Sequence, residues 1–284
     1  MSNIQWFPGH MTRAKRDMQE NMKAVDMVIE LRDCRIPESS RNPMIDQIIQ
    51  NKPRLIVLSK KDKGDPVEIE KWIQHLSNET TTVIAMDLTK DPVIAALTSA
   101  CQKIMQPKID RMIRRGIRPR AIRAMVCGIP NVGKSTLINA VAKKKIAETA
   151  DRPGVTRSLK WMKLNKNLEL LDTPGILWPK FEDEKVGYHL AITGAIRDQI
   201  LPMEDIVRYA LERLIKEYPD RLSERYKIEL CDDPDEVLRR IAAARNFVKA
   251  GSEADIKRTM EVFLNELRDD RLGCICWEKA NEEK

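Results

Sequence analysis

A glycine-rich segment near the middle of the chain carries the residue types that bind a nucleoside triphosphate. Residues 128–135 read Gly-Ile-Pro-Asn-Val-Gly-Lys-Ser, which fits the pattern G-x-x-x-x-G-K-[ST]. Glycines let the backbone curl so that its N–H groups converge on phosphate oxygens. We expect Lys134 to reach the β- and γ-phosphates and the Ser135 hydroxyl to offer an oxygen to Mg²⁺. The segment therefore predicts a phosphate-binding loop.

Two further segments predict the rest of a magnesium and γ-phosphate site. Asp172-Thr173-Pro174-Gly175 follows an apolar run, and an Asp at the end of a strand suits Mg²⁺ binding through a water molecule. Gly175 has no side chain, so its N–H is free to approach the γ-phosphate. Thr156 lies in a loop after Asp151-Arg152-Pro153-Gly154, where we expect a second hydroxyl ligand for Mg²⁺.

Residues upstream of the phosphate loop have the chemistry to select guanine. In Ser59-Lys60-Lys61-Asp62, the carboxylate of Asp62 can accept both the ring N–H and the exocyclic amine of guanine, while the stem of Lys60 packs on the base. The residues expected to bind the nucleotide are Ser59, Lys60, Asp62, Asp87, Leu88, Asn131, Val132, Gly133, Lys134, Ser135, Thr136 and Gly175.

These motifs require a framework in which several strands end at one edge. Six short apolar runs are expected to be strands, at 27–31, 55–58, 83–86, 124–127, 161–164 and 168–171. Helical patterns lie between most of them, at 12–25, 43–50, 67–76, 93–105 and 134–142. This alternation predicts an α/β domain with a mostly parallel sheet. The turn Asn165-Lys166-Asn167 joins the last two runs, so one edge is expected to be antiparallel.

The pattern changes after Pro179. Amphipathic helices are predicted at 186–198, 203–217, 235–247 and 254–270, with no further strand-like run. We therefore expect two domains, an α/β domain over residues 1–179 and an all-helical domain over residues 180–284.

Composition narrows the class of protein. The chain has 284 residues, of which 42% are hydrophobic, and its longest apolar runs are too short for a transmembrane helix. Residues 1–9 lack the basic and apolar regions of a secretory signal. The six Cys include no C-x-x-C pair and only three His are present, so neither a disulfide framework nor a structural zinc site is expected. These features predict a cytoplasmic protein.

Charge is distributed unevenly along the chain. The net charge is +7, yet residues 103–123 alone carry eight basic side chains and one acid. Residues 180–284 carry 19 basic and 24 acidic side chains. A partner rich in phosphate, such as RNA, is therefore expected mainly on the N-terminal two thirds. A solvated helix face followed by a basic linker explains the same run.

The order of the motifs sets this chain apart from ordinary GTPases, in which the phosphate loop comes first and the base-reading motif last. The reversed order resembles the circularly permuted GTPases. Within that group, the chain is similar to the YlqF/RbgA family of ribosome biogenesis GTPase A. The segments that carry the resemblance are 5–11 (QWFPGHM), 41–44, 120–123, 128–139, 151–154 and 171–184 (LDTPGILWPKFEDE).

The resemblance implies a circularly permuted GTPase domain followed by a helical domain associated with RNA or the ribosome. It implies GTP hydrolysis during late maturation of the bacterial large ribosomal subunit, with particle binding in the GTP state and release after hydrolysis. Ile176 stands where many GTPases place a water-orienting Gln, so slow turnover is expected without the large subunit. The family points to His10 as the catalytic substitute, beside Lys134 and Thr156. It also indicates K⁺ at Asn131.

Two departures from the family pattern affect base recognition. Ser59 replaces the usual Asn, and its shorter hydroxyl can bond less extensively, so a lower guanine affinity is expected. Asp87-Leu88 stands where the family has a small polar loop that contacts the base; its side chains match that loop poorly, and the resemblance implies that its backbone contacts the base oxygen. One alternative stays open, an RNA-binding guanine-nucleotide switch with negligible turnover and a non-ribosomal partner, which needs Thr156 but not His10. A P-loop ATPase acting on RNA is disfavoured by Asp62. Nothing in the sequence indicates a dimer, so a monomer is expected.

Overall fold

A mixed sheet forms the centre of the α/β part. The computed structural model describes residues 8–49, 51–148, 160–175, 177–178, 183–196, 201–249 and 253–281. Its six-stranded sheet has the order β3-β2-β1-β4-β6-β5. The strands are β1 (Met27–Asp33), β2 (Arg54–Ser59), β3 (Thr81–Ala85), β4 (Ile122–Cys127), β5 (Lys160–Lys163) and β6 (Leu168–Asp172). Only the β5–β6 pairing is antiparallel among these strands, which confirms the predicted α/β class and its antiparallel edge.

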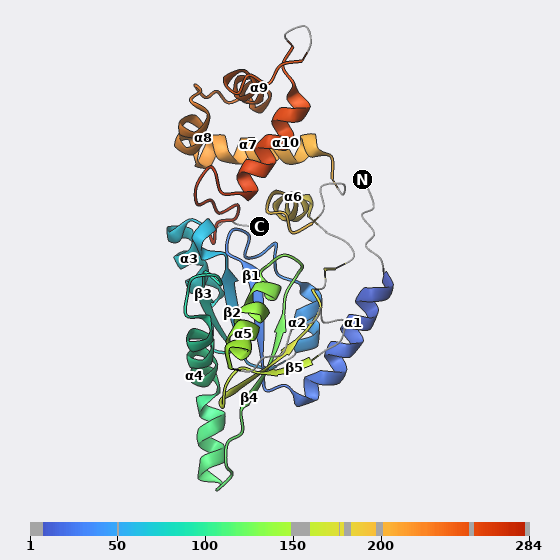
Figure 1. Ribbon diagram of the computed structural model, residues 1–284, viewed down its shortest axis with the longest axis vertical. Coiled ribbons are helices and arrows are strands. Elements are labelled where there is room, and N and C mark those ends of the chain that lie inside the picture. The colour runs from blue at the N-terminus through green and yellow to red at the C-terminus, as the bar shows by residue number, and fades with distance from the viewer. Residues whose placement is uncertain are drawn as a thin grey trace.

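Helices cover both faces of this sheet (Figure 1). Alternation along β1 sends Met27, Ile29 and Leu31 to one face, where they pack with residues of α4 and α5. Val28 points to the other face and packs with α1 and α2. The helices of this part are α1 (Pro8–Asn21), α2 (Pro43–Ile49), α3 (Pro66–Leu76), α4 (Val93–Arg114) and α5 (Lys134–Glu148).

The strand order is that of a circularly permuted GTPase domain. The strand β4, which leads into the phosphate loop, lies between β1 and β6. Strands β2 and β3, which lead into the predicted base-reading segments, come before β4 in the chain but on the far side of β1. The carboxyl ends of β1 and β4 therefore meet where the chain turns to opposite sides, the place where open α/β sheets bind ligands.

Among the described residues after 183, the regular secondary structure consists of helices, apart from one isolated β-bridge between Val248 and Ala254. Figure 1 shows them gathered beyond one end of the sheet. Asp233 begins α9 by accepting a hydrogen bond from the Asp235 N–H, with Pro234 in the first turn, both favourable at a helix start. The helices are α6 (Glu184–Ile192), α7 (Met203–Glu217), α8 (Pro219–Tyr226), α9 (Pro234–Ala244) and α10 (Ile256–Arg268). The short α8 is absent from the sequence prediction.

The prediction that α4 ends at residue 105 is wrong. The helix continues to Arg114 through Pro107, whose missing N–H removes one hydrogen bond. It ends where the Ile117 N–H donates to the Met112 carbonyl at 3.0 Å. Most side chains of residues 106–120 are exposed, and Figure 1 shows this end of α4 extending beyond the body of the protein. We call residues 106–120 the basic arm.

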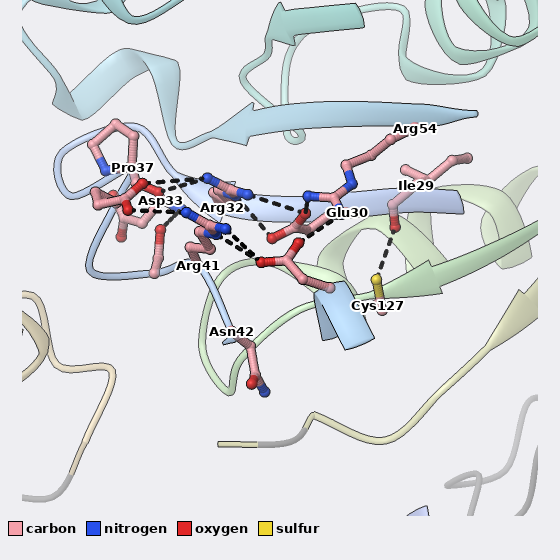
Figure 2. A network of polar contacts seen from close by, with 12 residues as sticks. Ile29, Glu30, Arg32, Asp33, Pro37, Arg41, Asn42, Arg54 and Cys127 are labelled. Atoms are coloured by element: carbon pink, nitrogen blue, oxygen red, sulfur yellow. Dashed lines mark hydrogen bonds and ion pairs between the residues drawn. The ribbon is translucent and has the colours of Figure 1, made fainter. Parts of the chain in front are cut away.

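Buried charges on β1 were also not foreseen. Glu30 and Arg32 are 1% and 2% exposed, on the face covered by α1 and α2. Arg32 Nε lies 2.8 Å from Glu30 Oε1, and Arg54 Nη1 lies 3.2 Å from Glu30 Oε2. Arg54 also pairs with Asp46 of α2 at 2.6 Å. Figure 2 shows this network beside β1; it joins two strands and a helix through ion pairs.

None of the helices in the described part of the chain is both long and apolar enough to cross a bilayer.

Candidate functional site

A cavity of about 570 Å³ opens at the carboxyl edge of the sheet. It is formed by the segments that follow β2, β3, β4 and β6, so all three sequence motifs contribute to it. Its lining residues are Lys60, Asp62, Lys63, Asp87, Leu88, Thr89, Pro130, Asn131, Gly133, Lys134, Ser135, Thr136 and Gly175. The topology thus brings the predicted phosphate-binding and base-binding residues to a single site.

The phosphate loop has the backbone geometry that its glycines predict. Gly128 and Gly133 have φ angles of +150° and +95°, and Asn131 has a φ of +60°. A Cβ at Gly128 would lie 2.6 Å from the Leu31 carbonyl oxygen, so only glycine fits there. Left-handed residues beside right-handed ones turn successive N–H groups toward one point, which suits an anion. The first residue of α5, Lys134, directly follows this curl, adding the positive end of a helix.

Lys134 is almost enclosed by protein, with 9% exposure. Its Nζ donates a hydrogen bond to the Thr173 carbonyl at 2.9 Å, and the Thr173 hydroxyl donates to the Val126 carbonyl at 2.7 Å. A Cβ on Gly175 would lie 3.3 Å from the same Nζ. The two phosphate motifs therefore pack directly against each other, with the lysine between them.

Burial governs the charge of this lysine. It lowers the pKa of Lys134 to about 8, although the nearby Asp172 carboxylate favours the charged form. Burial likewise raises the pKa of Asp172, and Lys134 opposes that change. An amine with so few protein partners is ready to be stabilised by a phosphate. The Ser135 hydroxyl and the Asp172 carboxylate supply oxygen donors of the kind that Mg²⁺ prefers.

The base-reading side is built from residues 59–64, which we call the base loop. Lys60 has a φ of +57°, and its Nζ lies 2.9 Å from Asp33 Oδ2. The Ser59 hydroxyl is fully buried, lying 2.7 Å from the Val132 carbonyl and 3.0 Å from the Arg32 carbonyl. Ser59 therefore links the base loop to the phosphate loop. Asp62 lines the cavity.

Asp87 has a mainly local role in this structure. Its carboxylate accepts hydrogen bonds from the Thr89 N–H at 2.9 Å and the Thr89 hydroxyl at 2.6 Å. These bonds lower the pKa of Asp87. They turn the chain so that Leu88 and Thr89 reach the cavity.

The structure separates the predicted nucleotide-binding residues into two groups. Ten of them line the cavity, whereas Ser59 and Val132 lie buried behind its wall. Lys63, Thr89 and Pro130 also line it and were not predicted. Pro130 lies inside the quoted phosphate motif and Lys63 directly follows Asp62, so their place beside these motifs was the signal available for them.

Several predicted site residues lie outside the described part. Thr156 and Ile176 lie outside the residues that the structure describes. For His10 only the backbone, in the first turn of α1, is described. Asn131, the predicted K⁺ ligand, donates through Nδ2 to the Gly194 carbonyl at 3.0 Å. The phosphate loop is thereby joined to the segment that follows α6.

Sequence comparison finds similarity to a GTPase family and to GTPases named for ribosomes. The family described as "50S ribosome-binding GTPase" matches residues 123–231. The chain is 49% identical over 281 residues to "Ribosome biogenesis GTPase A" of Priestia megaterium, covering 98% of both chains. It is 34% identical to "Mitochondrial ribosome-associated GTPase 1" of Mus musculus, covering 84% of this chain and 75% of that protein.

Comparison with solved structures supports the fold. A GDP-bound structure of YlqF matches with a TM-score of 0.66 at 24% identity, covering 93% of this chain and 99% of that one. The GNP-bound YlqF of T. maritima matches with a TM-score of 0.63 at 22% identity, covering 95% and 100%.

Proposed function

Because this chain belongs to the family of ribosome biogenesis GTPase A, we propose that it hydrolyses GTP during late maturation of the large ribosomal subunit. The GTP state binds the subunit precursor, and hydrolysis releases it. The observation that carries this proposal is the cavity at which the phosphate loop, the buried Lys134 and the base loop converge. We place the reaction in the cytoplasm, with the protein acting as a monomer.

The residues around the cavity divide the work of binding. N–H groups of the curled phosphate loop hold the phosphates, and Lys134 neutralises charge on the β- and γ-phosphates. Asp62 accepts two hydrogen bonds from guanine, which adenine cannot offer in that arrangement. Ser135, Asp172 and Thr156 would hold Mg²⁺, which neutralises charge that develops on the phosphate oxygens.

Hydrolysis needs a group that orients the attacking water. Ile176 has no hydrogen-bonding side chain, so we assign this role to His10, which can bond a water in either protonation state. Its position in the first turn of α1 puts it on an element that a bound particle could shift. Asn131 would help to hold K⁺, whose charge substitutes for an arginine supplied by a partner. Its side-chain oxygen has no role in the hydrogen bond to Gly194, which uses Nδ2.

The basic arm is the surface that we assign to ribosomal RNA. Among the described residues, no ion pair engages Arg111, Arg114, Arg115 or Arg118, whereas Lys108 and Arg120 pair with Asp26 at 2.8 and 2.7 Å. The arm has no aromatic side chain on which bases could stack, and its arginines suit the phosphate backbone.

The helical region, residues 183–281, has arginines whose charge is compensated by ion pairs, unlike the four arginines of the basic arm that form no ion pair among the described residues. In it, Arg239 and Arg240 pair with Glu236, and Arg245 pairs with Glu266. These arginines are therefore less available to a phosphate than those of the arm.

The test is GTP hydrolysis by the purified protein alone, with small subunits and with large subunits, each in K⁺ and in Na⁺ buffer. We expect stimulation by large subunits only, with faster turnover in K⁺. The His10→Ala variant should lose the stimulated turnover, by about 10²-fold or more, while it still binds GTP.

The ribosomal assignment, the role of His10 and the role of K⁺ can each be contradicted separately. Bound GTP with no stimulation by either particle would contradict the ribosomal assignment. Full turnover by His10→Ala would remove the histidine from the mechanism, and equal rates in K⁺ and Na⁺ would remove K⁺.

A further inference from the structure

The chain segment that follows α10 returns from the helical region to the nucleotide site. We call residues 270–280 the strap. Figure 1 shows this red trace running back to the sheet beside α3. Cys276 and Ala280 pack there against Ile69 and Trp72 of α3 in a buried cluster. The strap thus lies against the same edge of the sheet as the base loop.

Backbone contacts join the strap to the base loop directly. The Ile275 N–H donates to the Lys63 carbonyl at 3.1 Å. The Cys274 thiol donates to the Asp62 carbonyl at 3.3 Å. The two accepting carbonyls belong to Asp62 and Lys63. The Asp62 carbonyl and the Asp62 side chain are attached to the same Cα, so a bond that fixes the carbonyl also helps to fix the direction of the carboxylate.

The next strap residues bind the segment after β1. The Trp277 N–H donates to the Arg35 carbonyl at 2.8 Å. The Glu278 carboxylate accepts the N–H groups of Glu38 and Ser39 at 2.7 and 2.8 Å. This segment supports the base loop from behind, because the Cys34 thiol donates to the Lys60 carbonyl at 3.0 Å.

A chain of alternating charges follows the same path. Asp270 of the strap pairs with Lys63 of the base loop, and its other oxygen lies 3.6 Å from Arg35 Nη1. Arg35 pairs with Asp33 at 2.9 Å, and Asp33 pairs with Lys60 at 2.9 Å. Although burial alone would raise the pKa of Asp33, Arg35 and Lys60 hold it well below its usual range. Lys60 and Lys63 of the base loop are therefore anchored through this series of ion pairs.

The base loop needs such external support. Lys60 holds a left-handed conformation with φ +57°, which is unfavourable for a residue with a side chain. Such a conformation persists only where the surrounding structure imposes it. Asp33 and Cys34, and through them the strap, contribute to imposing it. The Lys63 N–H, which donates to the Lys60 carbonyl at 2.9 Å, and the Met86 carbonyl, which accepts from the Lys61 N–H at 3.3 Å, also contribute.

We propose that the strap is part of the guanine-recognition apparatus: it positions the base loop, so the helical region sets how tightly and how selectively the guanine base is held. The inference rests on the proposed function, because it takes Asp62 as the guanine acceptor. By linkage, a partner that shifts the helical region changes guanine affinity, and the nucleotide changes the partner's affinity by the same factor.

The test weakens the strap without removing it. The double variant Asp270→Asn/Cys274→Ala loses the ion pair to Lys63 and the thiol bond to the Asp62 carbonyl. We expect GDP to dissociate about tenfold faster, with KM for GTP affected more than kcat because the phosphate loop is untouched. Selectivity for GDP over inosine diphosphate, which lacks the exocyclic amine, should fall.

A matched control is Asp269, the residue directly before Asp270. Asp269→Asn removes the same charge from an exposed position and should leave GDP release, selectivity and thermal melting unchanged. If the double variant does not fold, Asp270→Asn alone carries the same test with a smaller effect.

The outcomes separate the two proposals. Equal GDP release and equal selectivity in the double variant, the control and the unmodified protein would overturn the strap's role. If the unmodified protein itself did not prefer guanine to hypoxanthine or adenine nucleotides, the assignment of Asp62 would fail instead.

Discussion

At the scale of single residues, Lys134 has a charge that depends on its surroundings. Its folded pKa lies near 8 because of burial, whereas a bound phosphate favours the charged amine and raises that pKa. The complex therefore holds more protons than the free protein when the pH lies above about 8.

We predict that GDP binding takes up close to one proton at a pH about one unit above the folded pKa of Lys134, and almost none well below it. Affinity should fall as the pH rises through that range. Titration calorimetry in buffers of different ionisation enthalpy measures the uptake. Proton release on binding, or uptake that persists in Lys134→Arg, would contradict this assignment.

The sequence predicted most of the residues that line the cavity. The glycines and Lys134 could be predicted because a phosphate loop depends on local backbone geometry that eight consecutive residues encode. Ser59 could not be placed, since its hydroxyl bonds to carbonyls of Arg32 and Val132, which are distant in the chain. Thr89 was missed for a different reason, because its position depends on a local turn made by the Asp87 carboxylate.

At the scale of elements, β1 shows how tertiary structure permits buried charge. Glu30 lies between Arg32 and Arg54, both within 3.2 Å or less. Removing one partner from such a pair leaves uncompensated charge in the interior. The network therefore fixes the register of β1 and β2 against α2.

We predict that Glu30→Gln lowers the free energy of unfolding by about 3 kcal/mol. The exposed pair of Arg16 and Glu20 on α1 provides the control, and Glu20→Gln should be nearly silent because solvent screens that pair. Urea unfolding followed by circular dichroism gives both values. Equal stability of the two variants would show that the buried pair does not hold the sheet.

Element boundaries were predictable only where local signals decide them. The strands were found from their apolar runs, but β1 continues through Arg32 and Asp33, which no hydropathy pattern assigns to a core. The prediction ended α4 at residue 105, two residues before Pro107, whereas the helix continues to Arg114. A proline favours a break in a helix, but the solvent-exposed side of a helix tolerates one. The short α8 buries only Leu222 and Tyr226, too few to make a periodic pattern.

At the scale of the whole molecule, charge and shape coincide in the basic arm. Ile113 and Ile117 near its tip are 57% and 50% exposed, and the pairs with Asp26 attach its base to the body. The unpaired arginines are therefore presented away from the protein, where a large anionic surface can reach them.

We predict that replacing four arm arginines by glutamine weakens binding to a mixed-sequence RNA duplex and to large subunits. The magnitude of the slope of log affinity against log salt should fall by about 3.6, since each of the four phosphate contacts contributes about 0.9. GTP binding should be retained. The substitutions are Arg111→Gln, Arg114→Gln, Arg115→Gln and Arg118→Gln.

The control for the arm removes the same total charge from exposed lysines elsewhere. Its substitutions are Lys23→Gln, Lys71→Gln, Lys163→Gln and Lys166→Gln. Filter binding or fluorescence anisotropy over a salt series compares the two proteins. If both lose RNA affinity equally, net charge rather than the arm is responsible.

The strap also has a consequence for how the protein is made. Asp62 and its partner Cys274 are separated by 212 positions, so the ribosome synthesises the base loop long before the segment that holds it. At ordinary elongation rates the interval is about 10 to 40 seconds. Once residues 128–135 have been added, the nascent chain has its phosphate loop but an unsupported base loop. A nascent chain therefore discriminates poorly among nucleotides, and selectivity for guanine arises only once nearly the whole chain has been translated.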